Sequence, residues 1–321
     1  MSTIPSTSKR HSVPYTVVGG GRSGRARRFP TPLTLLLLNR GGRFFKHAFF
    51  EELTRLGPEE IISIEGPTAS YEIENLSRDF PSVKFMVLHE PTSRGEQINL
   101  GVEEAKGELV FVIWNDMKLS PSSIATRILE RVRESDSLCT VPLVQNARLE
   151  TVPTIMAPAF YNKLLKVLAL QPSSDGIMSL FPFDYCGVYN KERFILVGGY
   201  DSSLENPYWQ KMDFGFRSYM WGEKILCSTA LHVSYSGELP SEDATPDEGY
   251  EVFFLKNLSV RFTGDSGVLP RSRLFPYIFR SGGAVSALRA FSRARAWVEV
   301  NRFRFKQDAR SVTELWEVPE V

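Results

Sequence analysis

Short, nearly continuous apolar runs alternate with longer stretches of helical spacing through the first half of the chain. Strands that are buried on both faces of a parallel sheet carry such runs, and they occur here at Leu33–Leu38, Glu60–Ile64, Val83–Leu88 and Glu108–Ile113. The stretches between them carry apolar residues three or four positions apart and predict helices at residues 44–56, 71–80 and 97–106. This order predicts an α/β fold whose parallel strands are joined by right-handed helical crossovers.

The pattern is less regular in the second half. It predicts three further strands, at Leu138–Gln145, Phe183–Tyr189 and Lys224–Ser228. Residues 153–170 read as a mixture of loop and helix, and a helix of about three turns is predicted from Trp209 to a stop near Gly222. Residues 240–250 form an acidic loop, either over a site or as solvated surface. Residues 284–300 have the pattern of a basic amphipathic helix.

Both ends of the chain differ in composition from its middle. Residues 1–30 are rich in Ser, Gly and Arg and predict a flexible basic arm. Within this arm the run VVGGGRSG could be taken for a phosphate loop, but no long strand precedes it and the basic run RARR follows, so we favour the arm. We therefore expect one large domain at 31–240. An extension at 241–321 would comprise the acidic loop and then basic and aromatic segments.

Composition indicates a globular protein with a substantial core and excludes a general nucleic-acid binder. The hydrophobic fraction is 42% and the net charge is +1. Three widely spaced cysteines give no disulfide framework or zinc spacing, which favours a reducing compartment. The apolar run LTLLLL is too short to span a bilayer, and the first 30 residues lack the apolar core of a signal peptide. We expect a cytoplasmic protein.

Candidate chemistry begins where the fourth predicted strand stops, at Trp114-Asn115-Asp116. A carboxylate at the C-terminal end of a buried strand lies where α/β sheets bind ligands, and it suits a divalent metal and the phosphates that such a metal holds. Asp116 would equally well cap the helix that starts near Pro121. On spacing alone the two readings are evenly balanced.

The segment Ser93–Pro121 resembles the nucleotide-sugar domain of family 2 glycosyltransferases. The resemblance is carried by Gly95, Asn99 and Gly101, then Ala105 and Gly107, then the run LVFVI, Trp114-Asn115-Asp116 and Pro121. Only the last acid of the family's Asp-x-Asp-like motif is present. The likeness covers about Leu33 to Glu238. It implies a GT-A, Rossmann-like three-layer sandwich with a mostly parallel sheet, to which this chain adds a C-terminal helical extension.

The resemblance also implies a set of residues that bind a nucleotide sugar. They lie at the ends of the predicted strands and at the start of a helix: Asn39, Arg40, Glu65, Arg94, Asn115 and Asp116. Glu65 stands where the family commonly has Asp, so it keeps the charge and adds a methylene. Arg94 beside a helix start could neutralise a diphosphate. An ordinary polar strand end remains the alternative for Asn39, Arg40 and Glu65, and a solvent-exposed side chain remains the alternative for Arg94.

A divalent metal, Mn²⁺ or Mg²⁺, is implied by the same resemblance. Asp116, with Asn115, would hold it together with His232, which matches a late His of many GT-A enzymes. Neutral imidazole is a suitable ligand for Mn²⁺ and a hydrogen-bond donor to phosphate. A histidine satisfied by its own neighbours is the alternative.

The run Val197-Gly198-Gly199-Tyr200-Asp201 and the helix after it also resemble the family's acceptor side, with a tight turn as the other reading of the two glycines. That helix has Gln210 and Lys211 where the family has Glu-Asp, the second of which is the general base. Protonated Lys cannot take that role, although it could bind an anionic group. Asp213 is the best candidate base, with Glu205 or Asp201 as alternatives. Asp213 is two residues after Lys211, so its side chain points about 200° further round the helix than position 211. It could instead pair with Arg217 four residues on.

These expectations give an inverting glycosyltransferase that moves a sugar from a nucleoside-diphosphate sugar to a glycan or lipid-linked hydroxyl acceptor, with metal assistance. The acids missing at positions 114, 210 and 211 leave a second hypothesis, a non-catalytic GT-A-like binding protein in glycan assembly. Residues 284–300 would pack on the catalytic domain, our preferred reading. Alternatively they would make peripheral contact with anionic lipid at the inner face of the membrane.

Overall fold

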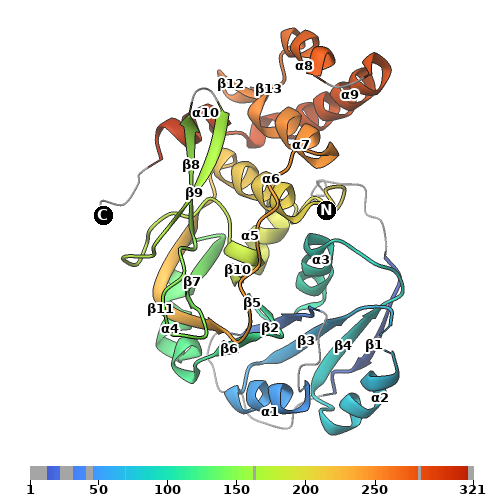
Figure 1. Cartoon of the computed structure of the whole chain (residues 1–321), viewed down its shortest axis with the longest axis vertical. Coiled ribbons are helices and arrows are strands. Elements are labelled where there is room, and N and C mark those ends of the chain that lie inside the picture. Colours follow the sequence, from blue (N-terminus) through green and yellow to red (C-terminus); the bar gives the residue numbers. More distant parts are fainter. Residues whose placement is uncertain are drawn as a thin grey trace.

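The computed structural model describes residues 13–21, 32–40, 46–68, 70–161, 164–280 and 283–316. Their centre is a nine-stranded sheet of order β1-β4-β3-β2-β5-β10-β7-β11-β6 (Figure 1). Its strands are β1 Tyr15–Gly19, β2 Leu33–Leu38, β3 Glu60–Glu65, β4 Val83–Leu88, β5 Leu109–Trp114, β6 Met117–Leu119, β7 Cys139–Gln145, β10 Gly187–Asn190 and β11 Ile225–Tyr235. Six of these strands run in one direction, and β1, β6 and β10 run in the other. The predicted mostly parallel α/β sheet is confirmed.

Helices cover both faces of this sheet, as a three-layer sandwich requires. The helices are α1 Lys46–Leu56, α2 Ser70–Asp79, α3 Arg94–Glu104, α4 Thr126–Glu134, α5 Lys191–Leu196, α6 Pro207–Met220, α7 Glu248–Phe253, α8 Leu274–Arg280, α9 Ala284–Asn301 and α10 Ala309–Glu314. In Figure 1, α1 and α2 lie on one side of the sheet and α3 and α6 on the other. Every residue of β2, β3 and β5 is buried, which explains their nearly continuous apolar sequences.

Part of the N-terminal segment is ordered, contrary to the prediction of a flexible arm over residues 1–30. Residues 15–19 form β1, which pairs antiparallel with the edge of β4. Gly19 has φ +79°, and a Cβ there would lie 2.4 Å from the carbonyl oxygen of Val83. The first two glycines of the VVGGG run therefore permit a close approach to β4. Residues 1–12 and 22–30 are outside the described residues.

Two other predictions for the second half were wrong. Two antiparallel strands, β8 Ile155–Tyr161 and β9 Leu164–Leu170, pair with each other where a mixture of loop and helix was expected. Leu, Lys and Ala favour helix in isolation, but pairing between the two strands decides the outcome. The predicted strand Phe183–Tyr189 is shortened: residues 183–185 form a turn in which Asp184 and Tyr185 adopt φ values of +50° and +62°, and β10 starts only at Gly187.

Two motifs that carried the resemblance meet in space. Asn99 on α3 donates to the carbonyl of Tyr200 and accepts from its N–H, both at 2.8 Å. It thereby holds the turn that contains Gly199, whose φ is +66°. A Cβ on Gly101 would lie 2.4 Å from Leu36, so α3 can pack this closely on β2 only with glycine there. These motif residues fix the position of α3 against the rest of the site.

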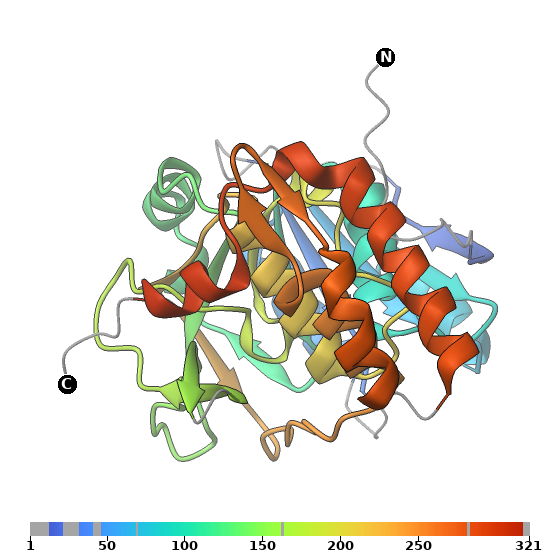
Figure 2. The same ribbon diagram turned by 90° about the horizontal axis from the view of Figure 1, so that it is seen from above.

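The C-terminal extension packs on α6 (Figure 2). Trp221, just after α6, stacks on Trp297 of α9 at 5.9 Å, and Tyr219 meets Trp316 edge-on at 4.9 Å. Helix α9 buries Phe291, Ala294 and Val298 among others, as expected if residues 284–300 pack on the domain. A short hairpin, β12 Arg261–Thr263 and β13 Ser266–Val268, adjoins it. No helix in the described part of the chain is both long and apolar enough to cross a bilayer.

Candidate functional site

Strands β2, β3 and β5 are parallel neighbours, so their carboxyl ends meet at one edge of the sheet. This edge brings together most of the predicted nucleotide-sugar residues. Asn39 donates to the carbonyl of Ile64 at 2.7 Å and to Glu65 at 3.1 Å. Glu65 is buried and also pairs with Lys46 at 3.3 Å. Asn39 and Glu65 thus form one polar unit beside the ends of β2 and β3.

Arg40 lies at the centre of the edge. Its Nε is 3.6 Å from Asp116 and its Nη2 pairs with Asp184. Its guanidinium stacks on Trp114, with the central carbon 4.1 Å from the ring centroid. Its backbone is held by Asn115, whose Oδ1 accepts from the Arg40 N–H at 3.0 Å. The side chain of Arg40 is therefore clamped between two carboxylates and an aromatic face.

Asp184 and Tyr235 complete this cluster and were not predicted. Asp184 accepts a hydrogen bond from the hydroxyl of Tyr235, and its carbonyl accepts from Trp114 Nε1 at 2.8 Å. The sequence carries one signal for Asp184, which is the only acid within the apolar run of residues 181–189. Nothing in the sequence indicates the left-handed backbone that turns its carboxylate toward Arg40.

Asp116 keeps one oxygen free. Its Oδ1 is buried and has no hydrogen-bond partner among the residues that the structure describes. Burial raises the pKa of this carboxyl above its ordinary value, while the nearby Arg40 charge opposes that shift. An unpaired buried acceptor beside a cation is a site for an incoming hydroxyl or amide donor.

Two further cations face the cluster. Arg94, the first residue of α3, lies 5.3 Å from the Trp114 ring and hydrogen-bonds Gln97 at 3.3 Å. Burial and then the charge of Arg40 lower its pKa, and no carboxylate pairs with it within the described residues. Lys211 on α6 is buried and pairs with Glu242. Burial lowers the pKa of Lys211, although Glu242 opposes that shift.

Gln210, the other departure from the family's acidic pair, has a structural role. Its Oε1 accepts from the Gly95 N–H at 2.8 Å and from the Tyr185 hydroxyl at 2.9 Å. Its Nε2 donates to the carbonyls of Asp201 and Leu204. The side chain is fully buried and joins α3, α6 and the loop before α6.

Asp213 does not lie at this edge. It is fully buried, pairs with Arg217 at 3.0 Å and accepts from Asn257 at 2.8 Å. Burial opposes ionisation, but Lys256 and Arg217 together hold the pKa of Asp213 below its usual value. A low pKa and full burial are the opposite of what a general base for an acceptor hydroxyl needs. The structure therefore supports the i, i+4 pair with Arg217 and not Asp213 as base. Asp201 is likewise buried, in a pair with Lys256.

His232 is also away from Asp116. It is three residues from Tyr235 on β11, so the two side chains lie on opposite faces of the strand. The Asp116 carbonyl accepts from the N–H of Ser236. Ser236 is four residues after His232, which is about 13 Å along the strand direction. The predicted pairing of Asp116 with His232 around a metal is therefore wrong.

The donor set at the edge does not fit a divalent metal. Mg²⁺ and Mn²⁺ prefer several oxygen ligands, and Arg40 occupies the space between the two carboxylates, Asp116 and Asp184. The described residues contain no group of three His, Cys, Asp or Glu side chains that could hold a metal ion. The segment 41–45 that follows β2 reads GGRFF and has no such side chain to add.

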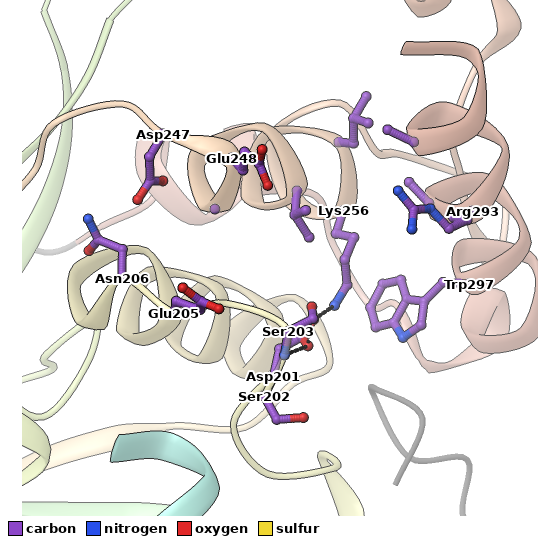
Figure 3. A pocket seen from close by; sticks show the side chains of 15 residues that line it. Asp201, Ser202, Ser203, Glu205, Asn206, Asp247, Glu248, Lys256, Arg293 and Trp297 are labelled. Atoms are coloured by element: carbon purple, nitrogen blue, oxygen red, sulfur yellow. Dashed lines mark hydrogen bonds and ion pairs between the residues drawn. The ribbon is translucent and has the colours of Figure 1, made fainter. Parts of the chain in front are cut away.

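A cavity of about 920 Å³ lies on the other side of the loop before α6 (Figure 3). Its walls come from residues 201–206, from residues 247–256, which contain α7 and the start of the π-helical turn after it, and from α9. They carry Asp201, Glu205, Asn206, Asp247, Glu248, Lys256, Arg293 and Trp297. Figure 3 shows Lys256 directed at Asp201, with Glu205 and Glu248 on facing elements. The lining combines carboxylates with an aromatic face.

The loop 236–247 connects the two regions. Glu242 pairs with Lys211 at the strand-end site. Further along, the carbonyl of Asp243 accepts from Asn206, the carbonyl of Thr245 accepts from Trp209 Nε1 at 3.0 Å, and Asp247 lines the cavity. The acidic loop expected either over the site or as solvated surface thus contributes Glu242 to the site. Nothing in the sequence singles out Glu242 among its acids.

Comparison with known proteins gives similarity in structure alone. No protein-family model matches the sequence, and no curated protein matches it. Among solved structures, GalNAc-T7 with UDP, GalNAc and Mn²⁺ has a TM-score of 0.61 at 13% identity, over 89% of this chain. S. aureus TarS 1–349 in complex with UDP-GlcNAc has a TM-score of 0.51 at 10% identity, over 82% of this chain and 71% of its own.

This chain spans 57% of the GalNAc-T7 chain it matches. Both proteins are GT-A glycosyltransferases. Identities this low show a shared fold and no more. The sheet order, the flanking helices and these superpositions together show that this chain has the GT-A fold.

Proposed function

We propose that this protein is a glycosyltransferase whose donor is a nucleoside-diphosphate sugar. The observation that carries the proposal is the pair of guanidinium groups, Arg40 and Arg94, against the Trp114 ring at the carboxyl ends of β2 and β5. This edge is where open α/β sheets bind ligands, and Arg94 has a charge that no carboxylate offsets in the described structure. A diphosphate supplies the missing negative charge. Asn39 and Glu65 then offer hydrogen-bonding groups to the nucleoside.

The reaction would be a single displacement with inversion, as the resemblance to family 2 implies. The acceptor hydroxyl oxygen attacks the anomeric carbon, the bond from that carbon to the diphosphate oxygen breaks, and its electron pair leaves with the diphosphate. Arg40, Arg94 and Lys211 offset the charge that develops on the leaving group. A base takes the hydroxyl proton.

Glu242 is the carboxylate best placed to act as that base. It is partly exposed and is held by Lys211, which stands at the position where the family carries its own acid. A glutamate on the loop thus supplies the carboxylate that position 211 lacks. Asp213 and Asp201 are buried in ion pairs, and Glu205 lines the cavity beside α6, whereas Glu242 pairs with Lys211 at the strand-end site.

The cavity beside α6 is the proposed acceptor subsite. Carboxylates accept hydrogen bonds from sugar hydroxyls, and Trp297 offers an apolar face for a sugar ring. Within the loop 236–247, Glu242 is the proposed base and Asp247 lines the cavity. The segment between them therefore links the base to this subsite. A glycan or a lipid-linked sugar fits this lining.

A panel of UDP-, GDP- and dTDP-sugars tests the proposal, with release of the nucleoside diphosphate measured with and without glycan acceptors. We expect release from at least one donor, faster when an acceptor is present. The second candidate, a non-catalytic GT-A-like binding protein, is favoured by Gln210 and Lys211 in place of acids. Binding of a nucleotide without release from any donor would support it and contradict a transferase.

We also propose that the tip of the α8–α9 pair contacts an anionic membrane surface. It exposes large apolar side chains: Phe275 (68% exposed), Phe279 (89%), Val285 (65%) and Leu288 (48%). The exposed Arg289 lies on α9, and the exposed Arg271 lies in the single 3₁₀ turn directly before α8. Apolar side chains with neighbouring arginines match the interface of a bilayer that contains anionic lipid.

Co-sedimentation with phosphatidylcholine vesicles, with and without phosphatidylserine, tests this contact. We expect binding that requires phosphatidylserine and is lost when Phe275 and Phe279 are both changed to Ser. The matched control is Phe303→Ser, which removes an equally exposed ring (67%) outside this tip. Equal binding by the double variant and the control would refute the assignment.

A further inference from the structure

We infer that the guanidinium of Arg40 takes the place of a divalent metal, so that the donor diphosphate is bound without one. This inference rests on the proposed function and concerns the same site. It departs from the expectation of Mn²⁺ or Mg²⁺ and from the Mn²⁺ in the GalNAc-T7 structure.

The position of Arg40 carries the inference. A metal held by the last acid of the β5 motif would lie against Asp116 and a second carboxylate, here Asp184. Arg40 makes both of those contacts itself, through Nε and Nη2. Tyr235 reinforces the arrangement, because its hydroxyl donates to Asp184 and accepts from Arg40 Nη2 at 3.4 Å. A cation is therefore already present between the carboxylates, fixed by covalent attachment to β2.

The sequence around the site agrees with this geometry. Trp114 stands where the family's motif has its first acid, and it provides a π-face for Arg40 and for Arg94. Asn115 is engaged with the Arg40 backbone through both its amide atoms, at 3.0 and 3.3 Å. Two of the three motif residues thus serve to hold an arginine.

Arg40 retains the capacity to bind phosphate. Its Nη1 has no hydrogen-bond partner among the described residues, and its side chain is 21% exposed. Arg94 lies on the same ring and adds a second guanidinium. Two guanidinium groups present a fork geometry that matches phosphate oxygens. Asp116 and Asp184 then position Arg40, while the phosphate contacts fall to the two arginines.

Calorimetric titration of UDP, GDP and dTDP into wild-type protein tests the inference, first with EDTA and then with Mn²⁺ or Mg²⁺. We expect at least one nucleotide to bind with an affinity that changes less than about twofold between these conditions. Arg40→Ala should weaken that binding by about tenfold or more, the usual effect of losing a charged hydrogen bond. Arg40→Lys keeps a positive charge at this position. Affinity that Arg40→Lys retains and Arg40→Ala loses shows that the loss comes from the missing charge and not from unfolding. Arg133→Ala on the exposed face of α4 is the control.

Mn²⁺ binding is read separately from the electron paramagnetic resonance signal of the free ion with protein alone. We expect wild type to leave that signal undiminished. Nucleotide binding that appears only with Mn²⁺, or Mn²⁺ bound by wild type and released by Asp116→Asn, would overturn the inference and leave the proposed function standing. Absence of binding by all three nucleotides in every condition would instead overturn the proposed function, and the inference with it.

Discussion

Arg217→Met will lower the free energy of unfolding by about 3–5 kcal/mol, the usual result of removing one partner from a buried ion pair. Arg217 is fully buried and pairs with Asp213, and it also donates to the carbonyls of Val197 and Gly199. The variant leaves Asp213 charged in the core and frees the turn that Asn99 holds. The loss is a large share of the stability of an ordinary domain, and urea unfolding followed by circular dichroism measures it.

An exposed pair of the same spacing provides the control. Arg310 pairs with Glu314 at 2.7 Å, and both side chains are more than half exposed. Arg310→Met should change stability by less than about 0.5 kcal/mol. Equal effects of the two substitutions would show that the Asp213–Arg217 pair is not the structural element described above.

A second comparison separates the structural role of Asp213 from a catalytic one. Asp213→Asn should lower the free energy of unfolding, yet the fraction of the variant that is folded should keep the turnover number of wild type.

Glu242→Gln will lower the turnover number by about 10²–10⁴-fold, the range for loss of a general base, with little change in nucleotide affinity. Glutamine has nearly the same size as glutamate and can still accept a hydrogen bond from Lys211, but it cannot take the acceptor proton. Release of nucleoside diphosphate from the active donor, with acceptor present, measures the effect. Calorimetry with the nucleotide alone shows whether binding is retained.

Glu238→Gln on the same loop is the matched control, because Glu238 is exposed and Lys211 pairs with Glu242 and not with Glu238 in the described part of the chain. It should turn over at the wild-type rate. A Glu242→Gln enzyme that keeps its turnover number while its apparent affinity for the acceptor falls would contradict the base assignment and indicate a binding role.

The fold could be predicted because strands buried on both faces leave an unmistakable pattern. β2, β4 and β5 matched the predicted ranges to within one residue. The same reasoning located much of the site, since parallel strands bring their carboxyl ends together whatever the loops do. Asn39, Arg40, Glu65 and Asp116 met at that edge as expected, with Arg94 close by.

The errors arose where backbone conformation or register decides a side chain's direction. His232 lay on the wrong face of β11, a matter of strand register that spacing alone does not reveal. Asp184 reaches Arg40 only because two successive residues adopt positive φ. Glu242 comes from an acidic loop in which no residue is distinguished by sequence. Asp213 pairs with Arg217 as its helical spacing allowed, and its burial removed it from the chemistry.

The most direct test of the central claim is the affinity of Arg94→Ala for nucleoside diphosphates, measured by calorimetry beside wild type and Arg133→Ala. Arg94 lies at the proposed diphosphate position and has no carboxylate partner among the described residues, so its removal subtracts a phosphate contact and exposes no buried acid. The account predicts that wild type and Arg133→Ala bind a nucleotide equally and that Arg94→Ala binds it about tenfold more weakly. Equal affinity in all three proteins would place the nucleotide elsewhere and contradict the account.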